Sequence, residues 1–221
     1  LFGEWGQPGG RYFVEWLSSI HVIEPFDIPK EWRKYVAFDY GLDMFACYFF
    51  AVDYRNNIYC YKEIYKSDLI VSEAIKTVKE FIDEEEEIYE YIAPPDMWNK
   101  RQETGKSIAD IFAENGIYLS KASNDRVQGW LNIKEYLKIY SDEQQIPTAK
   151  LKFFKNCVNM IRCIPKLMHD EKYYNDIGKE PHELTHAPDA LRYFIASQPG
   201  ANTPVTPPVT CNFEVEKKKE I

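Results

Sequence analysis

Three apolar stretches rich in aromatic and β-branched residues follow one another early in the chain, and they constrain its fold more than any other feature. They span residues 35–41, 46–53 and 58–65, and the polar run DYRNN (53–57) joins the last two. Residues of this kind favour strands, and turn-forming residues between two such runs favour a hairpin. We therefore expect a meander of three strands at the start of a sheet.

Helical and strand patterns alternate along the rest of the chain. Between residues 69 and 82 apolar residues recur with the period of a helix, for which Ser67 or Asp68 is the expected cap. This order indicates an α/β fold, with a mixed sheet of five strands or slightly more and helices on both faces. The other expected strands lie at 87–96, 117–122 and 149–154, and the other expected helices at 106–116, 124–140, 155–168 and from 186 onward.

The length of 221 residues suits one domain with appendages. We expect a lead-in segment outside the core at 1–34, the main domain at 35–198, and a proline-rich linker with a charged tail at 199–221. The chain starts with Leu1 and shows no signal-peptide pattern, which favours a fragment of a longer protein. No apolar run is long enough for a membrane span, so we predict no membrane partner.

Charge and cysteine content exclude some functions. The net charge is -8, from 27 basic and 35 acidic residues, which argues against simple polyanion binding unless acids hold metal ions. The five cysteines form no CxxC pair, which favours reduced, buried thiols in a cytosolic setting. ETGKS (103–107) resembles the end of a phosphate-binding loop, but Lys100 stands where the first glycine belongs. We therefore predict no ATP site there, and expect Thr104 or Ser107 to cap the following helix.

Three acids stand at positions that call for an explanation. Asp39 lies within an apolar strand, where a carboxylate is costly unless it is paired, hydrogen-bonded or bound to metal. Asp96 follows a strand, at the kind of position where open α/β sheets bind ligands. Asp189 lies in the first turn of the last helix, where the helix dipole favours a negative charge. Taken singly, an ion pair explains Asp39, a turn cap explains Asp96 and a helix terminus explains Asp189. Taken together, the three acids indicate one site.

The segments YVAFDYG (35–41), APPDMW (93–98) and HAPDALRYF (186–194) resemble the nuclease domain of the large terminase subunit of tailed bacteriophages. The lead-in GEWGQPGGRYF is similar to the segment that follows the ATPase domain in that family. The resemblance covers about residues 3–197, and its last motif is the most specific. It implies a ribonuclease H-like fold.

The resemblance also implies roles for single residues. Asp39, Asp96 and Asp189 match the family's metal-binding and catalytic acids, and His186 matches a histidine that often precedes the third acid. Because Ala187 precedes a proline, His186 is expected just outside the helix, as a ligand, a proton shuttle or a support for the loop. Asp43 and Asp176 are spare acids that we do not predict as principal ligands. Arg192 either steadies the site or faces solvent.

Three carboxylates form a hard, oxygen-rich site, which suits Mg²⁺ or Mn²⁺ and disfavours zinc. Two such ions about 3.5–4 Å apart can bracket a scissile phosphate. The expected activity is metal-dependent endonucleolytic cleavage of double-stranded DNA concatemers during viral packaging. The candidate DNA-contacting cations are Lys100, Arg101, Lys106, Lys121 and Arg126.

The family further implies an N-terminal ATPase domain, a small terminase subunit and a portal as partners, in the cytoplasm of the host cell. Two alternatives stay open. One is another ribonuclease H-like nuclease, such as a transposase or a junction resolvase. The other is a non-enzymatic assembly module whose acids hold one structural ion. Cleavage products and metal stoichiometry distinguish them.

Overall fold

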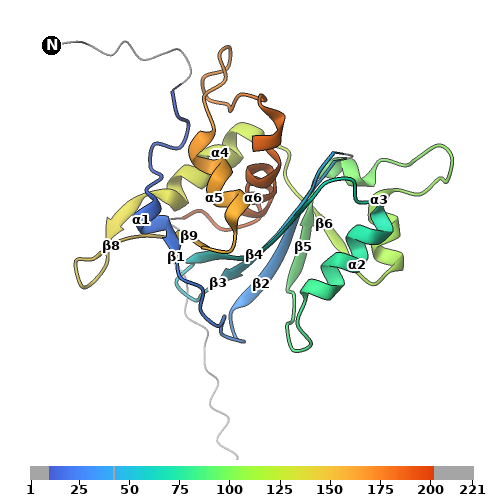
Figure 1. Cartoon of the computed structure of the whole chain (residues 1–221), viewed down its shortest axis with the longest axis horizontal. Coiled ribbons are helices and arrows are strands. Elements are labelled where there is room, and N and C mark those ends of the chain that lie inside the picture. Colours follow the sequence, from blue (N-terminus) through green and yellow to red (C-terminus); the bar gives the residue numbers. More distant parts are fainter. Residues whose placement is uncertain (1–9, 42, 202–221) are drawn as a thin grey trace, which may run out of the picture.

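A seven-stranded mixed sheet forms the centre of the protein (Figure 1). The computed structural model describes residues 10–41 and 43–201, so the expectations for the tail beyond 201 and for Cys211 lie outside the described residues. The strand order is β1-β9-β4-β3-β2-β5-β6. The strands are β1 (Val22–Ile23), β2 (Arg33–Tyr40), β3 (Phe45–Val52), β4 (Ile58–Lys66), β5 (Glu90–Ala93), β6 (Leu119–Lys121) and β9 (Leu151–Phe154).

The middle of the sheet is the predicted antiparallel meander. β2 pairs with β3 along its whole length, so that Asp39 lies opposite Ala46, and β3 pairs in turn with β4. The turn between β3 and β4 is held by Asp53, whose Oδ1 accepts hydrogen bonds from the backbone N–H groups of Arg55 and Asn57. The run DYRNN therefore forms the turn that its composition predicts.

The strands on both flanks of the meander pair in parallel, β9 and β1 beside β4 and β5 and β6 beside β2. β5 pairs with β2, and β6 pairs with β5, each in parallel orientation. Parallel neighbours end at the same edge of a sheet, so the carboxyl ends of β2, β5 and β6 lie together. This edge receives Asp39 from β2 and the residues that directly follow β5.

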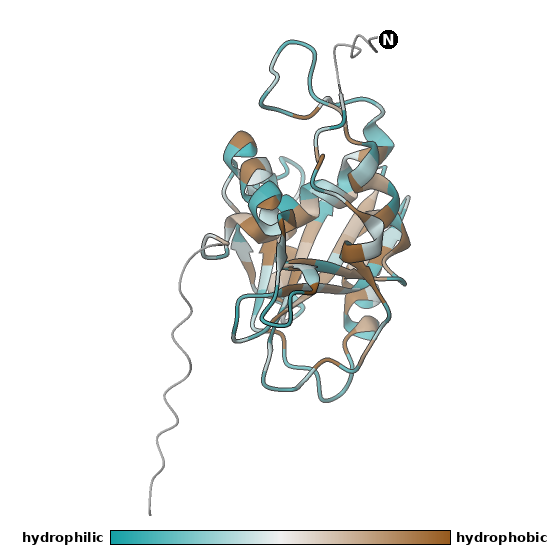
Figure 2. Ribbon diagram, turned by 90° about the vertical axis from the view of Figure 1, so that its left-hand side faces the viewer, coloured by the Kyte–Doolittle hydropathy of each residue, from teal (hydrophilic) through white to brown (hydrophobic). Residues whose placement is uncertain are grey.

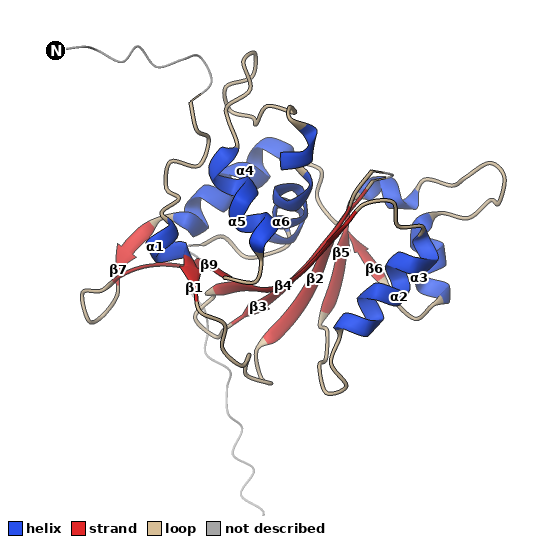
Figure 3. Ribbon diagram, in the orientation of Figure 1, coloured by secondary structure: helices blue, strands red, loops and turns tan. Residues whose placement is uncertain are grey.

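Helices cover both faces of the sheet (Figures 1 and 3). The helices α2 (Val71–Phe81) and α3 (Ile108–Glu114) lie on one face. The opposite face carries α4 (Arg126–Leu137), α5 (Val158–Cys163) and α6 (His186–Ala196). Short elements complete the chain: α1 (Ser18–His21), the hairpin β7 (Ile139–Ser141) and β8 (Pro147–Ala149), and the 3-10 turns η1 (Pro95–Trp98), η2 (Ile164–Lys166) and η3 (His182–Leu184).

A hydrophobic core lies on each face of the sheet, and side chains of β2 point alternately into the two cores. Val36 and Phe38 point to the α2 and α3 face, whereas Ala37 packs on the α6 face. Asp39 alternates with Phe38 and therefore shares the side of Ala37. Figure 2 shows hydrophobic residues concentrated in the strands and hydrophilic residues concentrated in the loops. The expected α/β class is confirmed, with two strands more than the minimum of five.

Some sequence expectations were wrong. The described part of the lead-in, residues 10–34, is not outside the core, because Tyr12, Phe13 and Trp16 are buried and β1 forms the sheet edge beside β9. Neither Ser67 nor Asp68 caps α2, whose N-cap is Ile70. Ser107 does cap α3, in a capping box with Asp110.

The four described cysteines, Cys47, Cys60, Cys157 and Cys163, are free and buried, as expected. Burial raises the pKa of the Cys47 and Cys60 thiols well above their ordinary value. Among the described residues, no helix has the length and apolar character that crossing a membrane requires.

Candidate functional site

Asp39 lies near the carboxyl end of β2, and its side chain is only 20% exposed. Its Oδ2 accepts a hydrogen bond from His186 Nδ1 at 2.8 Å, whereas its Oδ1 accepts none from the described residues. Burial raises the pKa of Asp39, and the negative charges of Asp189 and Asp96 raise it further against the opposing effect of His186. Two carboxylates distant in sequence therefore lie close enough to act on this one.

Asp96 lies in the 3-10 turn η1, directly beyond the carboxyl end of β5. Pro94 and Pro95 end the strand, because a proline has no N–H to donate to the ladder. The Asp96 side chain is exposed and makes no hydrogen bond to the described residues, while its backbone carbonyl accepts one from Asn99 N. Its carboxylate is thus available to a ligand.

Asp189 lies in the first turn of α6, and two arginines hold it. Arg192 donates from Nε and Nη2 to Asp189 Oδ1, each at 2.9 Å, and Arg126 Nη1 approaches the same oxygen to 3.2 Å. The second oxygen, Oδ2, receives only a 3.4 Å contact from Arg126. A carboxylate has about four lone-pair sites, so Oδ2 keeps capacity for a cation.

The arginines are themselves fixed in place. Arg192 is 2% exposed and lies over the rings of Trp130 and Tyr193. Arg126 Nε donates to Asp176 Oδ1 at 2.8 Å, and the same oxygen accepts from Trp130 Nε1. Asp176 therefore positions Arg126. Of the two expectations for Arg192, the structure favours the one in which it steadies the site.

His186 is the first residue of α6, contrary to the expectation that it lies just outside the helix. The chain already turns helically at η3, and Thr185 adopts helical angles with φ -94° and ψ -27°, so Pro188 falls within the first turn. The His186 imidazole is buried between two acids. Its Nδ1 bonds to Asp39 Oδ2, and its Nε2 lies 3.2 Å from Asp43 Oδ2. These acids raise the pKa of His186 in spite of the opposing effect of burial.

The five candidate DNA-contacting cations divide into two groups. Lys100, Arg101 and Lys121 are exposed, and Lys121 Nζ lies 5.1 Å from the centre of the Trp98 ring. Arg126 instead forms ion pairs with Asp176 and Asp189, and Lys106 Nζ lies 2.6 Å from Glu114. The first group is therefore better placed to meet a phosphate.

Sequence reasoning missed two features of this site. The pairing of Arg126 with Asp189 joins residues 63 positions apart, and no local pattern reveals it. The group formed by Asp43, His182 and His186 is easier to detect in the sequence. Its two histidines are four positions apart, and residues at that spacing lie on the same side of a helix. Asp43, expected to be a spare acid, is one of its members.

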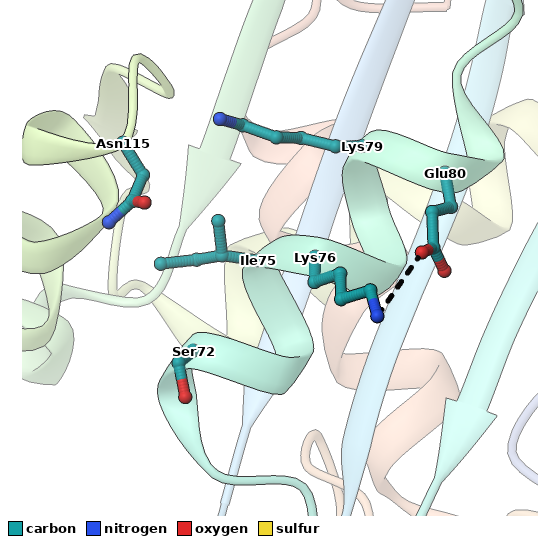
Figure 4. A pocket seen from close by; sticks show the side chains of 6 residues that line it. All are labelled: Ser72, Ile75, Lys76, Lys79, Glu80 and Asn115. Carbon is teal, nitrogen blue, oxygen red and sulfur yellow. Dashed lines mark ion pairs between the residues drawn. The ribbon is translucent and has the colours of Figure 1, made fainter.

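The cavity drawn in Figure 4 lies elsewhere, between α2 and the end of α3, and has a volume of about 310 Å³. Ser72, Ile75, Lys79 and Asn115 are among its lining residues, and none of the three acids is. Its cations and its Lys76–Glu80 ion pair at 3.7 Å belong to the outer surface of α2. We assign it no part in the site.

The fold agrees with the ribonuclease H-like fold that the sequence resemblance implied, with a mixed sheet and helices on both faces. Acidic residues lie at the carboxyl ends of its parallel strands. No protein-family model matches the sequence, and no curated protein does. Solved structures do match, among them large terminases and terminase nuclease domains.

The large terminase of a thermophilic bacteriophage has a TM-score of 0.67 at 19% identity, over 89% of this chain and 48% of that chain. This chain thus spans about half the length of that protein. The P22 large terminase nuclease domain has a TM-score of 0.66 at 18% identity, over 86% of this chain and 93% of that one. The large terminase nuclease of phage G20c with bound magnesium has a TM-score of 0.55 at 12% identity, over 83% and 96%. The resemblance expected from the motifs is confirmed at the level of the fold.

Proposed function

We propose that this chain is a metal-dependent endonuclease of a viral DNA-packaging terminase. One observation carries the proposal: Asp39, Asp96 and Asp189 come from two parallel strand ends and one helix start, and the charges of the last two act on the first. The fold shared with terminase nuclease domains supports the same function. Its substrate is concatemeric double-stranded DNA, cut by phosphodiester hydrolysis.

The donor atoms fit divalent cations that prefer oxygen. Each acid keeps a carboxylate oxygen without a strong partner among the described residues, and the mutual repulsion of three carboxylates is relieved by positive charge. Such donors suit Mg²⁺ or Mn²⁺. Two ions held by Asp39, Asp96 and Asp189 would activate a water molecule and stabilise the leaving 3′ oxygen.

The chain's own residues prepare this site. His186 donates its Nδ1–H to Asp39, which fixes the direction of that carboxylate, and it is therefore a positioning residue. Arg192 and Arg126 donate to Asp189 Oδ1, which fixes the direction of that carboxylate. Lys100, Arg101 and Lys121 are exposed near Asp96 and would bind the DNA backbone.

The wider setting belongs to the same proposal. The thermophilic phage terminase of which this chain spans about half has also been solved in complex with ADP, and there the match covers 45% of that chain. We propose that an ATPase domain precedes this segment in the full protein, that a small terminase subunit and a portal are its partners, and that it acts in the host cytoplasm.

Plasmid nicking with Mn²⁺ tests the proposed activity. Replacing Asp39, Asp96 or Asp189 by alanine should each lower the rate about a hundredfold or more, because metal-ion catalysis supplies several kcal/mol. Asp27→Ala, at an exposed acid outside the site, should leave the rate unchanged.

Undiminished cutting by the triple alanine variant would refute the proposed nuclease. Strand transfer or a preference for four-way junctions would instead assign the site to a transposase or a resolvase. Stabilisation by one ion without any DNA cleavage would assign it to an assembly module.

A further inference from the structure

A second group of ligand atoms lies beside the three acids, formed by Asp43, His182 and His186 and here called the histidine cluster. Asp43 Oδ2 is 3.1 Å from His182 Nδ1 and 3.2 Å from His186 Nε2. One ligand atom from each residue lies within 4.8 Å of the others. Asp43 follows β2, whereas the two histidines come from η3 and the start of α6.

The chemistry of this cluster differs from that of the three acids. Two imidazole nitrogens and one carboxylate oxygen form a donor set that favours Zn²⁺ and related transition ions over Mg²⁺. Two bonds of about 2.0–2.1 Å at a tetrahedral angle place their donor atoms roughly 3.3 Å apart. The separations of 3.1 Å and 3.2 Å around Asp43 Oδ2 are close to that value before any ion is added.

The surroundings of His186 also suit a metal ligand. Its Nδ1 bonds to Asp39 Oδ2 at 2.8 Å, which directs Nε2 toward Asp43 and His182. A carboxylate on the far nitrogen orients a metal-binding imidazole and makes it more basic. The side chains of His182 and Asp43 are 60% and 59% exposed, so an ion can reach them from solvent.

We propose that Asp43, His182 and His186 form a second cation site that takes one Zn²⁺-like ion with three protein ligands and one open position. This site is distinct from the oxygen-rich site of Asp39, Asp96 and Asp189. It goes beyond the proposed nuclease function, because it depends on ligand geometry and not on DNA cleavage.

Equilibrium Zn²⁺ binding, measured by competition with a chromophoric chelator in excess Mg²⁺, tests this site. The excess Mg²⁺ occupies oxygen donors, and Cys211→Ser is included in every protein because a thiolate also binds zinc. We expect one Zn²⁺ per chain, bound about tenfold or more weakly by Asp43→Ala and by His182→Ala. His169→Ala is the matched control, because His169 lies outside the cluster with its Nδ1 on Tyr174 O.

Equal Zn²⁺ affinity in His182→Ala and the unsubstituted chain would overturn the proposal. So would loss of Zn²⁺ binding in Asp96→Asn/Asp189→Asn with His182→Ala unaffected, because the ion would then lie among the acids. Circular dichroism confirms that each variant is folded. Neither result depends on nicking, so failure of this site and failure of the proposed nuclease are distinguishable.

Discussion

Burial and several neighbouring charges of the site change the pKa of Asp39. Burial and two neighbouring carboxylates favour its neutral form, while His186 favours the ionised form, and the result is a raised pKa. A raised pKa means that the folded protein holds this proton more tightly than the unfolded chain does. The stability that this proton contributes is present below the ordinary value of 3.8 and is lost as pH rises through the folded pKa.

Asp39→Asn should therefore stabilise the metal-free protein at neutral pH. Asparagine keeps the acceptor for His186 but removes the buried charge, so we expect the free energy of unfolding to rise by about 0.5–2 kcal/mol. The difference should shrink as the pH falls below the ordinary carboxyl value. Urea denaturation in EDTA across a pH series measures it, with Asp27→Asn as the control; a destabilised Asp39→Asn at neutral pH would contradict this reading.

At the residue scale, the sequence singles out the three acids but does not identify the side chains that contact them. Asp39, Asp96 and Asp189 stand out because each lies where a strand or helix makes a carboxylate unusual. Arg126 was predicted to contact DNA from its charge and its position after a strand, but it forms ion pairs with Asp176 and Asp189. The partners of Arg126 are 50 and 63 positions away in the sequence. Tertiary packing decides such pairs, and no local sequence pattern encodes them.

The longer elements that support the site lie close to their predicted ranges. The meander β2–β4 and the helices α2, α4 and α6 overlap the segments that the sequence predicted as strands and helices. β1, β7 and β8 were not predicted, because two or three residues are too few to show alternation. The buried aromatic residues of the lead-in were misjudged, because its glycines and prolines suggested a segment outside the core.

The contact between α4 and α6 shows how closely two elements pack beside Asp189. A Cβ on Gly129 of α4 would lie 2.5 Å from Arg192 Cγ on α6. Arg192 cannot move away easily, because it is buried and holds Asp189. This glycine therefore permits the close approach that positions the third acid.

Gly129→Ala should destabilise the protein by about 1–3 kcal/mol through overpacking, even though alanine gains about 1 kcal/mol in a helix interior. Gln128→Ala, at the exposed neighbouring position, should change stability by less than about 0.5 kcal/mol. Chemical denaturation of both variants measures the difference. A stabilising Gly129→Ala would show that α4 and α6 are not packed as described.

Over the whole molecule, a net charge of -8 must be reconciled with the polyanionic substrate that we propose. The exposed cations Lys100, Arg101 and Lys121 lie near the carboxyl ends of β5 and β6. In the proposed function, the three acids repel DNA without divalent ions, and with bound ions the same carboxylates become part of the DNA-binding surface. DNA affinity should therefore depend on divalent ions as well as on these side chains.

Lys100→Ala/Arg101→Ala should weaken duplex DNA binding and reduce the slope of log affinity against log salt by about 2. Fluorescence anisotropy with Ca²⁺ in place of Mg²⁺ measures this while limiting cleavage. Arg55→Ala is the control, because the β3–β4 turn lies at the opposite end of the sheet. An equal loss in both proteins would place the DNA elsewhere.

The location of Mn²⁺ in soaked crystals tests most directly whether the three acids form one site. Anomalous scattering should place Mn²⁺ between the carboxylates of Asp39, Asp96 and Asp189, with two ions at full occupancy. Ordered Mn²⁺ found only elsewhere, with these three side chains directed away from one another, would contradict the account.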